Sequence, residues 1–454
     1  MKKYDAIIIG AGQAGTPLAR KLAGAGWRTA LIEQRRIGGT CVNDGCTPTK
    51  TMIGAARICY MAGRAREFGI TLSSTVPDLS KIKARKDEVV QQSFDGLTRA
   101  VSKTDNLDYL EGKAVFTGMK TVEINGETLH AEHIFINTGA SAAIPPIKGL
   151  STVPYLTSTT ILDLTEVPEH LFILGAGYIA MEMGQMYRRF GSQVTMLEKS
   201  NRILGKEDED IAAEIHKILE EDGITILTGA ELKQVTSDDG HLRLEVSENG
   251  ATRTITCSHI LIAAGRPPNT ADLQLEQTGL HAEKNGTIAV NDRLETSVPG
   301  IYALGDVKGG PAFTHISYND YVIVWQNLLE NKELSIRNRH VPYCMFTDPE
   351  LGRIGLTEQE AREQGKNILV AKLPLTKVAR GIESGETRGL MKAIVDADTG
   401  LILGAAIVSV SGGEIMSVLQ MAMMGNLTCR QLRDGVFAHP TFSESLNNLF
   451  MSIT

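Results

Sequence analysis

The stretch that decides the fold is YDAIIIGAGQAG, residues 4–15, in which a short apolar run leads into a glycine-rich turn. A helical pattern over 16–25 and an apolar strand over 29–32 that ends in Glu33 complete the unit. The glycines follow the spacing GxGxxG, at Gly10, Gly12 and Gly15. In such units the first glycine makes a tight turn, the second lets backbone approach a pyrophosphate, and the third lets the helix pack on the strand. Amides at the start of the helix face the phosphates, and we expect Glu33 to bind a ribose.

The same pattern occurs a second time in HLFILGAGYIAMEMG, residues 170–184. Gly175 and Gly177 repeat the first two glycines, and Ala180 stands at the third position. Glu198 ends the next strand, and the interval from the first glycine to the acidic residue is 23 residues in both copies. Equal spacing in two copies predicts two dinucleotide sites in one chain.

Length and composition describe an ordinary globular protein of several domains. The chain has 454 residues, more than one hydrophobic core usually serves, and 42% of them are apolar. Its net charge of −7 provides no basic surface for nucleic acid or anionic lipid, and no stretch reaches the roughly 20 apolar residues of a membrane span. The start MKKY leads directly into an apolar strand without an export signal, and six cysteines in a chain of this length make no secreted disulfide scaffold. We therefore expect a cytoplasmic protein that binds neither nucleic acid nor membrane.

Three further segments have the form of a strand that ends at a cofactor. HIFINTGA (133–140) and HILIAAGRPPN (259–269) each close an apolar run with a small residue and glycine. PGIYALGDV (299–307) places Asp306 after a strand and a glycine. The alternative role for Asp306 is a helix N-cap, because Asp is a favoured cap residue.

From His340 onward the pattern changes to alternating strands and amphipathic helices over about 115 residues, an ordinary size for a separate domain. Methionines gather on one predicted helix of this part, at Met416, Met421, Met423 and Met424. Core packing or a subunit interface explains them better than a metal site, because thioether ligands need a clearer cluster.

A close pair of cysteines lies in GGTCVNDGCTPTK, residues 38–50, directly after the first nucleotide unit. In a reducing compartment a pair such as Cys41 and Cys46 is more often catalytic or metal-binding than structural. The residues alone leave three possibilities: a redox disulfide, a metal clip and an incidental disulfide. Their place beside a cofactor that could donate electrons favours the redox disulfide.

Together these motifs resemble the class I flavin-dependent pyridine nucleotide-disulfide oxidoreductases, which include dihydrolipoamide dehydrogenase, glutathione reductase and mercuric reductase. The resemblance covers essentially the whole chain and rests on separate motifs, namely GAGQAG, GGTCVNDGCTPTK, GAGYIAME, the TGA and AAGRPPN strand ends, YALGD, VPYCMFTDPELGRIGLTE and AHPTFSE. The segments AFTHISYNDYVIVWQNLL and AHPTFSESLNNLF are similar to a bacterial mercuric-reductase-like subgroup, which includes a reactive-chlorine-resistance flavoprotein that reduces cupric ion.

The fold that this resemblance implies is α/β, with two Rossmann-like dinucleotide-binding domains and a C-terminal α+β dimerisation domain. The implied boundaries are 1–147 with 268–338 for a discontinuous FAD domain, 148–267 for the NAD(P) domain and 339–454 for the dimerisation domain.

The resemblance implies FAD at the first nucleotide site and a nicotinamide cofactor at the second. The implied FAD contacts are Gly10, Gly12, Gly15, Glu33, Gly39, Thr40, Thr138, Gly139 and Asp306. The implied NAD contacts are Gly175, Gly177, Tyr178, Glu198 and Gly265. Tyr178 would cover the nicotinamide pocket, and the alternative is an aromatic side chain that packs on the second nucleotide fold. No resident metal is implied.

The resemblance also implies a path for electrons. Reduced nicotinamide would deliver hydride to FAD, which would reduce a disulfide between Cys41 and Cys46, with Cys46 against the flavin and Cys41 facing the acceptor. Lys50 and Glu182 would form an ion pair that stabilises negative charge on the flavin, and the alternative is a solvated surface pair of little energetic weight. Cys59, in RICYM, is interpreted as a buried helix residue rather than a third redox thiol.

A base completes the implied site. A thiol attacks a disulfide as thiolate and a leaving thiol needs a proton, so His439 would serve as base and Glu444 would orient its ring. A lone histidine is more often structural, but HPT with a glutamate five residues after the histidine matches the family pattern. In relatives the other subunit of a homodimer contributes this histidine. The chain is therefore expected to form a homodimer whose active sites each need both subunits.

Glu198 favours NADH over NADPH, because its charge would repel a 2′-phosphate. Ala180 at the third position and the neighbouring Lys199 and Arg202 favour NADPH instead. We expect NADH to be preferred, with NADPH possible.

Several molecules are candidates for the electron acceptor. A small disulfide is the leading one, and a thiophilic metal ion, cupric or mercuric, is the rival. The chain has no cysteine after Cys429 and no N-terminal CxxC domain, so efficient mercury reduction is not expected. Outside catalysis, a flavoprotein of this kind could be a docking subunit or a redox sensor.

Overall fold

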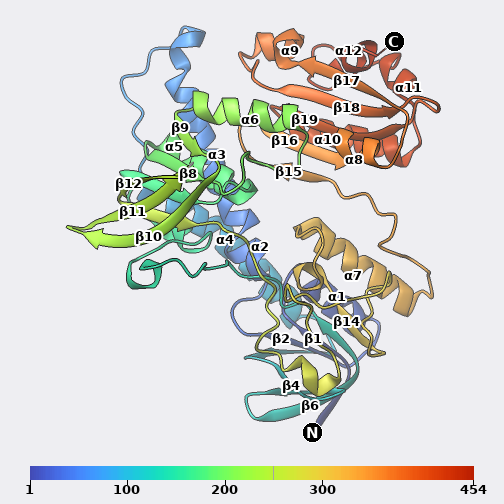
Figure 1. The fold of residues 1–454 in the computed structure, drawn as a ribbon. Helices are drawn as coiled ribbons and strands as arrows, with labels where there is room; N and C mark the ends of the chain where they lie inside the picture. Colours follow the sequence, from blue (N-terminus) through green and yellow to red (C-terminus); the bar gives the residue numbers. More distant parts are fainter. Residues whose placement is uncertain (249, 454) are drawn as a thin grey trace.

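The computed structural model describes residues 1–248 and 250–453. The strands of these residues form sheets of seven, three, four and five strands. Figure 1 shows the seven-stranded sheet near the N-terminus, the second nucleotide unit with a three-stranded sheet projecting from it, and the five-stranded sheet near the C-terminus. The mixture of sheets and helices confirms the α/β class, while the domain boundaries stay a prediction.

The seven-stranded sheet contains the first glycine-rich motif, GxGxxG at Gly10, Gly12 and Gly15, which we call the first fingerprint; the corresponding motif at Gly175 is the second. Its order is β3-β2-β1-β6-β5-β4, and β14 pairs with β6. The strands are β1 (Lys2–Ile9), β2 (Thr29–Glu33), β3 (Leu107–Glu111), β4 (Val115–Gly118), β5 (Thr121–Ile124), β6 (Glu127–Ile136) and β14 (Ile301–Ala303). The pairs that β1, β2, β3, β6 and β14 make with one another are parallel. Most of β1 is buried, because a parallel strand covered by helices needs apolar residues on both faces.

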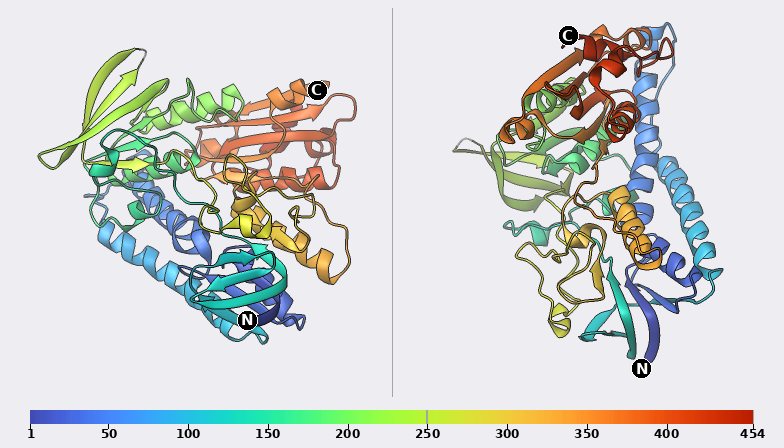
Figure 2. Two further views of the ribbon diagram at one scale, coloured as in Figure 1. Left: turned by 60° about the horizontal axis from the view of Figure 1, so that its bottom comes forward. Right: turned by 90° about the vertical axis from the view of Figure 1, so that its right-hand side faces the viewer.

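Helices cover this sheet and lead away from it. They are α1 (Gly15–Gly24), α2 (Gly39–Asn43), α3 (Cys46–Gly63), α4 (Leu79–Ser102) and α7 (Thr314–Leu329). The helix predicted over 16–25 is thus present one residue earlier. Leu18 and Leu22 of α1 pack in one buried cluster with Ile323 and Val324 of α7. Figure 2 shows α3 and α4 as two long neighbouring helices that extend toward the C-terminal sheet.

Segments far apart in the sequence meet at one edge of this sheet. Because β1, β6 and β14 are parallel, their carboxyl ends lie at the same edge. Gly10 follows β1, Asn137 follows β6 and Leu304 follows β14. The whole second nucleotide unit lies between β6 and β14 in the chain, so the first nucleotide site is completed by a segment that returns after it.

The second unit repeats the first. Its sheet has the parallel order β13-β7-β8-β9 and carries a three-stranded antiparallel sheet beside it. The elements are β7 (His170–Leu174), α5 (Tyr178–Phe190), β8 (Gln193–Leu197), α6 (Glu209–Glu221), β9 (Ile224–Leu227), β10 (Ala230–Asp238), β11 (His241–Glu248), β12 (Ala251–Cys257) and β13 (His259–Ile262). The series β7-α5-β8 corresponds to β1-α1-β2.

The C-terminal part is an antiparallel sheet of order β15-β16-β19-β18-β17 with helices around it. Its elements are β15 (Tyr343–Met345), β16 (Glu350–Gly355), α8 (Glu358–Glu363), β17 (Ile368–Pro374), α9 (Ala379–Glu383), β18 (Leu390–Asp396), β19 (Ile402–Ser409), α10 (Gly412–Met424), α11 (Cys429–Arg433) and α12 (Ser445–Met451). The predicted methionine face of α10 divides in two. Met416 and Met423 pack in the core, whereas Met421 and Met424 are 57% and 58% exposed.

Short 3-10 helices link these elements, at Ala65–Phe68, Leu150–Thr152, Thr160–Asp163, Leu275–Thr278, Gly305–Lys308 and Leu375–Lys377. Within residues 1–248 and 250–453, no helix combines the length and the apolar character that a bilayer crossing requires.

Candidate active site

The three glycines of the first fingerprint have different surroundings. Gly10 has a φ of +105°, and a Cβ there would collide with the carbonyl oxygen of Asn137. A Cβ at Gly12 would lie 3.0 Å from Asn137 Oδ1. A Cβ at Gly15 would collide with the Gly10 carbonyl oxygen, and the Gly15 N–H donates to Asn137 Oδ1 at 2.9 Å. Gly10 and Gly12 line a cavity, whereas Gly15 packs α1 against the turn.

The two acidic residues occupy equivalent positions in the two units. Glu33 accepts hydrogen bonds from the backbone N–H groups of Ala11 (2.8 Å) and Arg35 (2.9 Å). Glu198 repeats this pattern, since it accepts from the N–H one residue after the first glycine (3.1 Å) and from the N–H two residues after itself (2.9 Å). Each carboxylate ties a glycine turn to the end of the following strand, so the repeat extends to hydrogen bonds.

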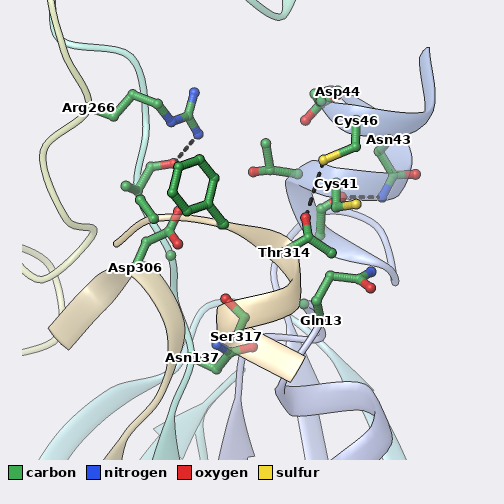
Figure 3. A pocket seen from close by; sticks show the side chains of 18 of the residues that line it. Gln13, Cys41, Asn43, Asp44, Cys46, Asn137, Arg266, Asp306, Thr314 and Ser317 are labelled. Carbon is green, nitrogen blue, oxygen red and sulfur yellow. Dashed lines mark hydrogen bonds between the residues drawn. The ribbon is translucent and has the colours of Figure 1, made fainter. Parts of the chain in front are cut away.

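A cavity of about 860 Å³ extends along this edge of the first sheet. Most of the predicted site residues line this cavity, namely Gly10, Gly12, Glu33, Gly39, Thr40, Cys41, Cys46, Lys50, Thr138, Gly139, Tyr178, Glu182 and Asp306. The predicted residues outside its walls are Gly15, Gly175, Gly177, Glu198, Gly265, His439 and Glu444. Figure 3 shows Cys41 and Cys46 across the cavity from Asp306 and Arg266.

The residues of this cavity fit FAD. Its volume is in the upper range for ligand sites. A glycine floor, formed by Gly10, Gly12 and Gly39, leaves the backbone uncovered, and a Cβ on Gly39 would lie 2.8 Å from the Gly12 Cα. Glu33 beside this floor offers carboxylate oxygens to a ribose. A dinucleotide can therefore lie along the floor from Glu33 toward the cysteine pair.

Asp306 belongs to the same wall. It lies within the 3-10 helix Gly305–Lys308, whose N-cap position is held by Leu304, so the alternative role as an N-cap is wrong. Burial raises the pKa of Asp306, and the charges of Arg266 and Lys308 oppose that rise. Its carboxyl group is thus a partly buried acceptor inside a cavity.

The two cysteines are linked by a hydrogen bond that shifts their pKa values in opposite directions. Cys41 lies in α2, Cys46 begins α3, and both are free thiols. A hydrogen bond with Cys41 is the largest influence that lowers the pKa of Cys46, to about 6, and the Thr314 hydroxyl and Lys50 lower it further. The same hydrogen bond raises the pKa of Cys41, together with burial. In the reduced pair the thiolate is therefore on Cys46 and the proton on Cys41.

Thr314 is a site residue that sequence reasoning missed. It is the first residue of α7, and its hydroxyl oxygen lies 3.2 Å from Cys46 Sγ, as the dashed line in Figure 3 shows. A threonine at a helix start is ordinarily taken for a helix cap. Its contact with a thiol 268 residues away depends on the return of the chain to the first sheet.

Two other thiols nearby are poor nucleophiles. Cys59 of α3 packs against the hydrophobic core, and burial raises its pKa. Cys59 is half-buried rather than buried as expected, and its exclusion as a third redox thiol stays a prediction. Cys344 of β15 lines the cavity, which the sequence did not indicate, and burial raises its pKa as well. A raised pKa keeps a thiol protonated and therefore inert at neutral pH.

Lys50 and Glu182 form a close ion pair in the cavity wall. Lys50 Nζ lies 2.7 Å from Glu182 Oε2, and the Glu182 side chain is only 3% exposed. The second carboxylate oxygen accepts the backbone N–H of Phe346 at 2.8 Å, and the ammonium group lies 4.8 Å from the centre of the Phe346 ring. The Lys50 side chain is 31% exposed, but its carboxylate partner is buried, which does not fit the alternative of a solvated surface pair. A residue of the C-terminal part thereby helps to fix the pair.

The second fingerprint leaves more open space than the first. Gly175 has a φ of +106°, and a Cβ there would lie 2.6 Å from the Ala263 carbonyl oxygen. A Cβ at Gly177 or Gly265 would have no atom within 4 Å. Tyr178, which begins α5, is 39% exposed and lines the cavity. This exposure and the contact with the cavity place Tyr178 in the cavity wall rather than in the core. Desolvation in that wall raises the pKa of Tyr178 to about 12.

His439 and Glu444 meet on the surface of the chain. The Nδ1 atom of His439 lies 2.9 Å from both carboxylate oxygens of Glu444. The histidine side chain is 66% exposed, and neither residue is part of the cavity wall around the cysteines. Within one chain the pair is therefore formed but is separate from the thiols.

Comparisons with known proteins define the class to which this fold and cavity belong. A family model described as pyridine nucleotide-disulphide oxidoreductase matches residues 4–320, and one described as the dimerisation domain of that family matches residues 341–450. The chain belongs to the pyridine nucleotide-disulphide oxidoreductase family, whose members are FAD-dependent and use NAD(P)H. It is accordingly an oxidoreductase.

Particular relatives cover nearly all of the chain. It is 40% identical to the probable pyridine nucleotide-disulfide oxidoreductase RclA of Escherichia coli over 99% of both chains. It is 36% identical to a mercuric reductase of Staphylococcus aureus, over 98% of this chain and 81% of that protein. It is 35% identical to a dihydrolipoyl dehydrogenase of Thermus scotoductus, over 98% and 96%.

A solved structure, described as the Cu(II) complex of the HOCl-induced flavoprotein disulfide reductase RclA from Escherichia coli, superimposes with a TM-score of 0.92 at 39% identity. The superposition covers 100% of each chain.

Proposed function

We propose that this chain passes electrons from NADH through FAD and the Cys41–Cys46 pair to a small disulfide. The observation that carries the proposal is the shared cavity, in which the glycine floor and Cys46 line one continuous wall. Membership of the family identifies the cofactors as FAD and NAD(P)H. The cavity supports the order in which electrons pass, from FAD to the cysteine pair.

The side chains of the cavity have distinct tasks in this scheme. FAD, when bound, supplies the transfer of electrons between the nicotinamide and the thiol pair. The glycine floor would leave room for its phosphates, and Glu33 and Asp306 would accept hydrogen bonds from its hydroxyl groups. Glu182 fixes the Lys50 ammonium group in the wall, so that its charge stabilises negative charge that develops nearby.

The thiol step is an exchange between sulfurs. Cys41 loses its proton, and its Sγ forms a mixed disulfide with one sulfur of the acceptor while the other sulfur leaves and takes a proton. The Cys46 thiolate then attacks Cys41 Sγ, which closes the Cys41–Cys46 disulfide and releases the second thiol, protonated from solution. The low pKa of Cys46 keeps this second nucleophile ready at neutral pH.

A second copy of the chain supplies the base in this scheme. His439 and Glu444 are already hydrogen-bonded to each other and exposed, and they lie outside the cavity wall of their own chain. The segment 341–450 matches a dimerisation domain. We therefore infer a homodimer in which the partner subunit's His439 removes the Cys41 proton, and we place this dimer in the cytoplasm, where thiols stay reduced.

The surroundings of Glu198 support NADH as the preferred reductant. Lys199 is drawn toward Glu231 at 3.7 Å, and Arg202 donates to the Gly205 carbonyl oxygen at 2.9 Å. Both cations are thus engaged elsewhere, and Glu198 presents its charge to the ribose position. Equal or better kcat/KM with NADPH would contradict this preference.

A thiophilic metal ion is the second candidate acceptor. It is supported by the likeness to a Cu(II) complex of RclA and to mercuric reductases. Among the residues that the structure describes, no three His, Cys, Asp or Glu side chains gather as a metal site. An ion acceptor would therefore be bound by Cys41 and Cys46 themselves, as substrate. A docking subunit or redox sensor is the non-catalytic alternative, and a bound flavin that NADH never bleaches would favour it.

One experiment separates these candidates. NADH oxidation is measured with lipoamide, oxidised glutathione, cupric ion, mercuric ion, quinone and oxygen as acceptors, for the natural chain and for Cys41→Ser. We expect Cys41→Ser to keep reduction of FAD by NADH and to lose disulfide turnover, because the nucleophile that meets the acceptor is gone. Disulfide turnover that survives Cys41→Ser would overturn the thiol mechanism. Turnover with cupric ion alone would favour the second candidate.

A further inference from the structure

The internal repeat allows the two nucleotide sites to be compared position by position. In the first unit a Cβ on Gly10 would point at the carbonyl oxygen of Asn137, and in the second a Cβ on Gly175 would point at that of Ala263. Asn137 and Ala263 are therefore equivalent, each directly after the strand beside the fingerprint strand. An amide side chain stands in the first unit where the second has a methyl group.

The Asn137 side chain joins three segments of the first site. Its Nδ2 donates to the Leu304 carbonyl oxygen at 2.8 Å, and its Oδ1 accepts the Gly15 N–H at 2.9 Å. Asn137 itself follows β6, so one amide connects β6, the fingerprint turn and the segment after β14. The residue is 7% exposed and lines the cavity, where Figure 3 shows it near Ser317.

Two glycines are fitted against this amide. A Cβ on Gly12 would lie 3.0 Å from Asn137 Oδ1, and a Cβ on Gly305 would lie 2.9 Å from Asn137 Nδ2. Gly305 precedes Asp306, and its N–H donates to the fully buried Asp320 at 2.8 Å. The position of Asp306 relative to the glycine turn thus depends on Asn137.

The second unit cannot form this connection. Ala263 has no polar side-chain atom, so neither the donated nor the accepted bond of Asn137 has an equivalent there. The two sites also differ in how long they must hold their cofactors, and this difference matches the presence and absence of the amide. A flavin stays bound through many turnovers, whereas a nicotinamide must enter and leave in each one.

We propose that Asn137 is the positioning residue that makes the first nucleotide site retain its cofactor, and that Ala263 leaves the second site free to exchange. The proposal rests on the assignment of FAD to the first site. Asn137 holds the fingerprint turn and the Asp306 segment at a fixed separation, so the two sides of the FAD site do not part. Without the amide, the Gly15 N–H and the Leu304 carbonyl lose their shared partner and the segments move independently.

The test measures FAD binding directly. Apo-protein is titrated with FAD and the quenching of flavin fluorescence gives Kd, while thermal unfolding of the apo-protein reports on the fold. We expect Asn137→Ala and the similarly sized Asn137→Leu to raise Kd for FAD by at least about tenfold and to speed FAD release. The affinity for NAD⁺, measured by calorimetry, should not change, because Asn137 makes its hydrogen bonds with Ile9, Gly15 and Leu304 of the first site.

Asn327→Ala is the matched control. Asn327 also donates one bond (2.9 Å) and accepts one (2.8 Å), both with the backbone of Leu334, and it lies outside the cavity wall. It should leave Kd for FAD unchanged. FAD binding of Asn137→Leu equal to that of the natural chain would overturn the proposal. A fall in apo-protein stability that accounts for the whole loss of FAD affinity would also overturn it. A natural chain purified without flavin would instead contradict the FAD assignment.

Discussion

At the scale of single residues, the cavity turns an ordinary thiol into an ionised one. Cys46 has a pKa of about 6, so it is mostly thiolate at neutral pH. The stabilising groups are the Cys41 thiol, the Thr314 hydroxyl and the Lys50 charge. Cys41 lies in α2, Thr314 begins α7, and Lys50 lies one helical turn after Cys46 in α3, so two of the three groups come from other elements.

Replacing Thr314 tests this account of Cys46. Thr314→Val keeps the shape of the side chain and removes the hydroxyl that lies 3.2 Å from the sulfur. A hydrogen bond to a charged group is worth about 1.5 to 3 kcal/mol, so we expect the pKa of Cys46 to rise by about one unit or more. The measurement is the pH dependence of alkylation of Cys46 in Cys41→Ser protein, with Thr314→Ser as the control that restores the hydroxyl. Coincident pH profiles for Thr314→Val and its parent would contradict the assignment.

At the scale of elements, the strand–turn–helix unit uses glycine for two separate purposes. At Gly15 the protein itself fills the space, because a Cβ would collide with the Gly10 carbonyl oxygen. At Gly177 the space is open, since no atom lies within 4 Å of a Cβ position. Gly15 therefore serves packing, and Gly177 leaves room for a ligand.

Substitution by alanine should separate these purposes. Gly177→Ala should leave thermal unfolding unchanged and raise KM for NADH by about tenfold, because the new methyl group meets only the nucleotide. Gly15→Ala should destabilise the protein by roughly 4 kcal/mol or more, because backbone must move. Thermal unfolding and steady-state kinetics measure both. A loss of stability in Gly177→Ala comparable to that of Gly15→Ala would show that the open space is needed for folding.

At the scale of the whole molecule, buried ion pairs join the second nucleotide unit to the C-terminal sheet. Lys392 of β18 is 2% exposed, and its Nζ lies 3.1 Å from Asp208, 2.9 Å from Asp210 and 2.9 Å from Glu358. Asp208 and Asp210 stand at the start of α6. The C-terminal part, which contains His439, and the unit that carries Glu198 are thereby held together.

Removal of this charge should weaken the whole chain. Lys392→Met leaves Asp208 without a cation, while Asp210 keeps Lys372 and Glu358 keeps Arg362. Breaking a buried pair by removal of one partner costs about 3 to 5 kcal/mol. Lys372→Met is the matched control, because Lys372 is 47% exposed and pairs with Asp210 alone, so its loss should cost less than about 1 kcal/mol. Urea unfolding measures both variants. Equal midpoints for the two would contradict the role of Lys392.

A separate experiment tests the proposal that each active site combines Cys41 of one subunit with His439 of the partner subunit. Cys41→Ser and His439→Ala should each lack disulfide turnover, but a mixture refolded together should regain about a quarter of natural activity, because half of randomly formed dimers are mixed and each has one intact site. Separately refolded and then combined samples are the control. A mixture that stays inactive while mixed dimers are present would place His439 and Cys41 in the same subunit.

Much of the first site was predictable because its residues are local in sequence. The spacing of the glycines and the acid in each copy follows from the geometry of one strand, one turn and one helix. Lys50 lies one helical turn after Cys46, and Glu444 lies five residues after His439. Thr314 and Cys344 were not predicted, because each reaches the cavity only through the packing of distant segments. Asn137 directly precedes the predicted Thr138, but its role was not predicted because its partners, Gly15 and Leu304, are far away in the sequence.

By itself the sequence determined the α/β class, the two nucleotide units, the thiol pair and the family, since each depends on residues close together along the chain. The tertiary structure alone decided which thiol is ionised, how deeply Glu182 of the expected ion pair is buried, and how exposed His439 is on its own chain. The physical reason is that pKa, burial and reach depend on distances through space, and the chain returns to its first sheet only after it has built a second one.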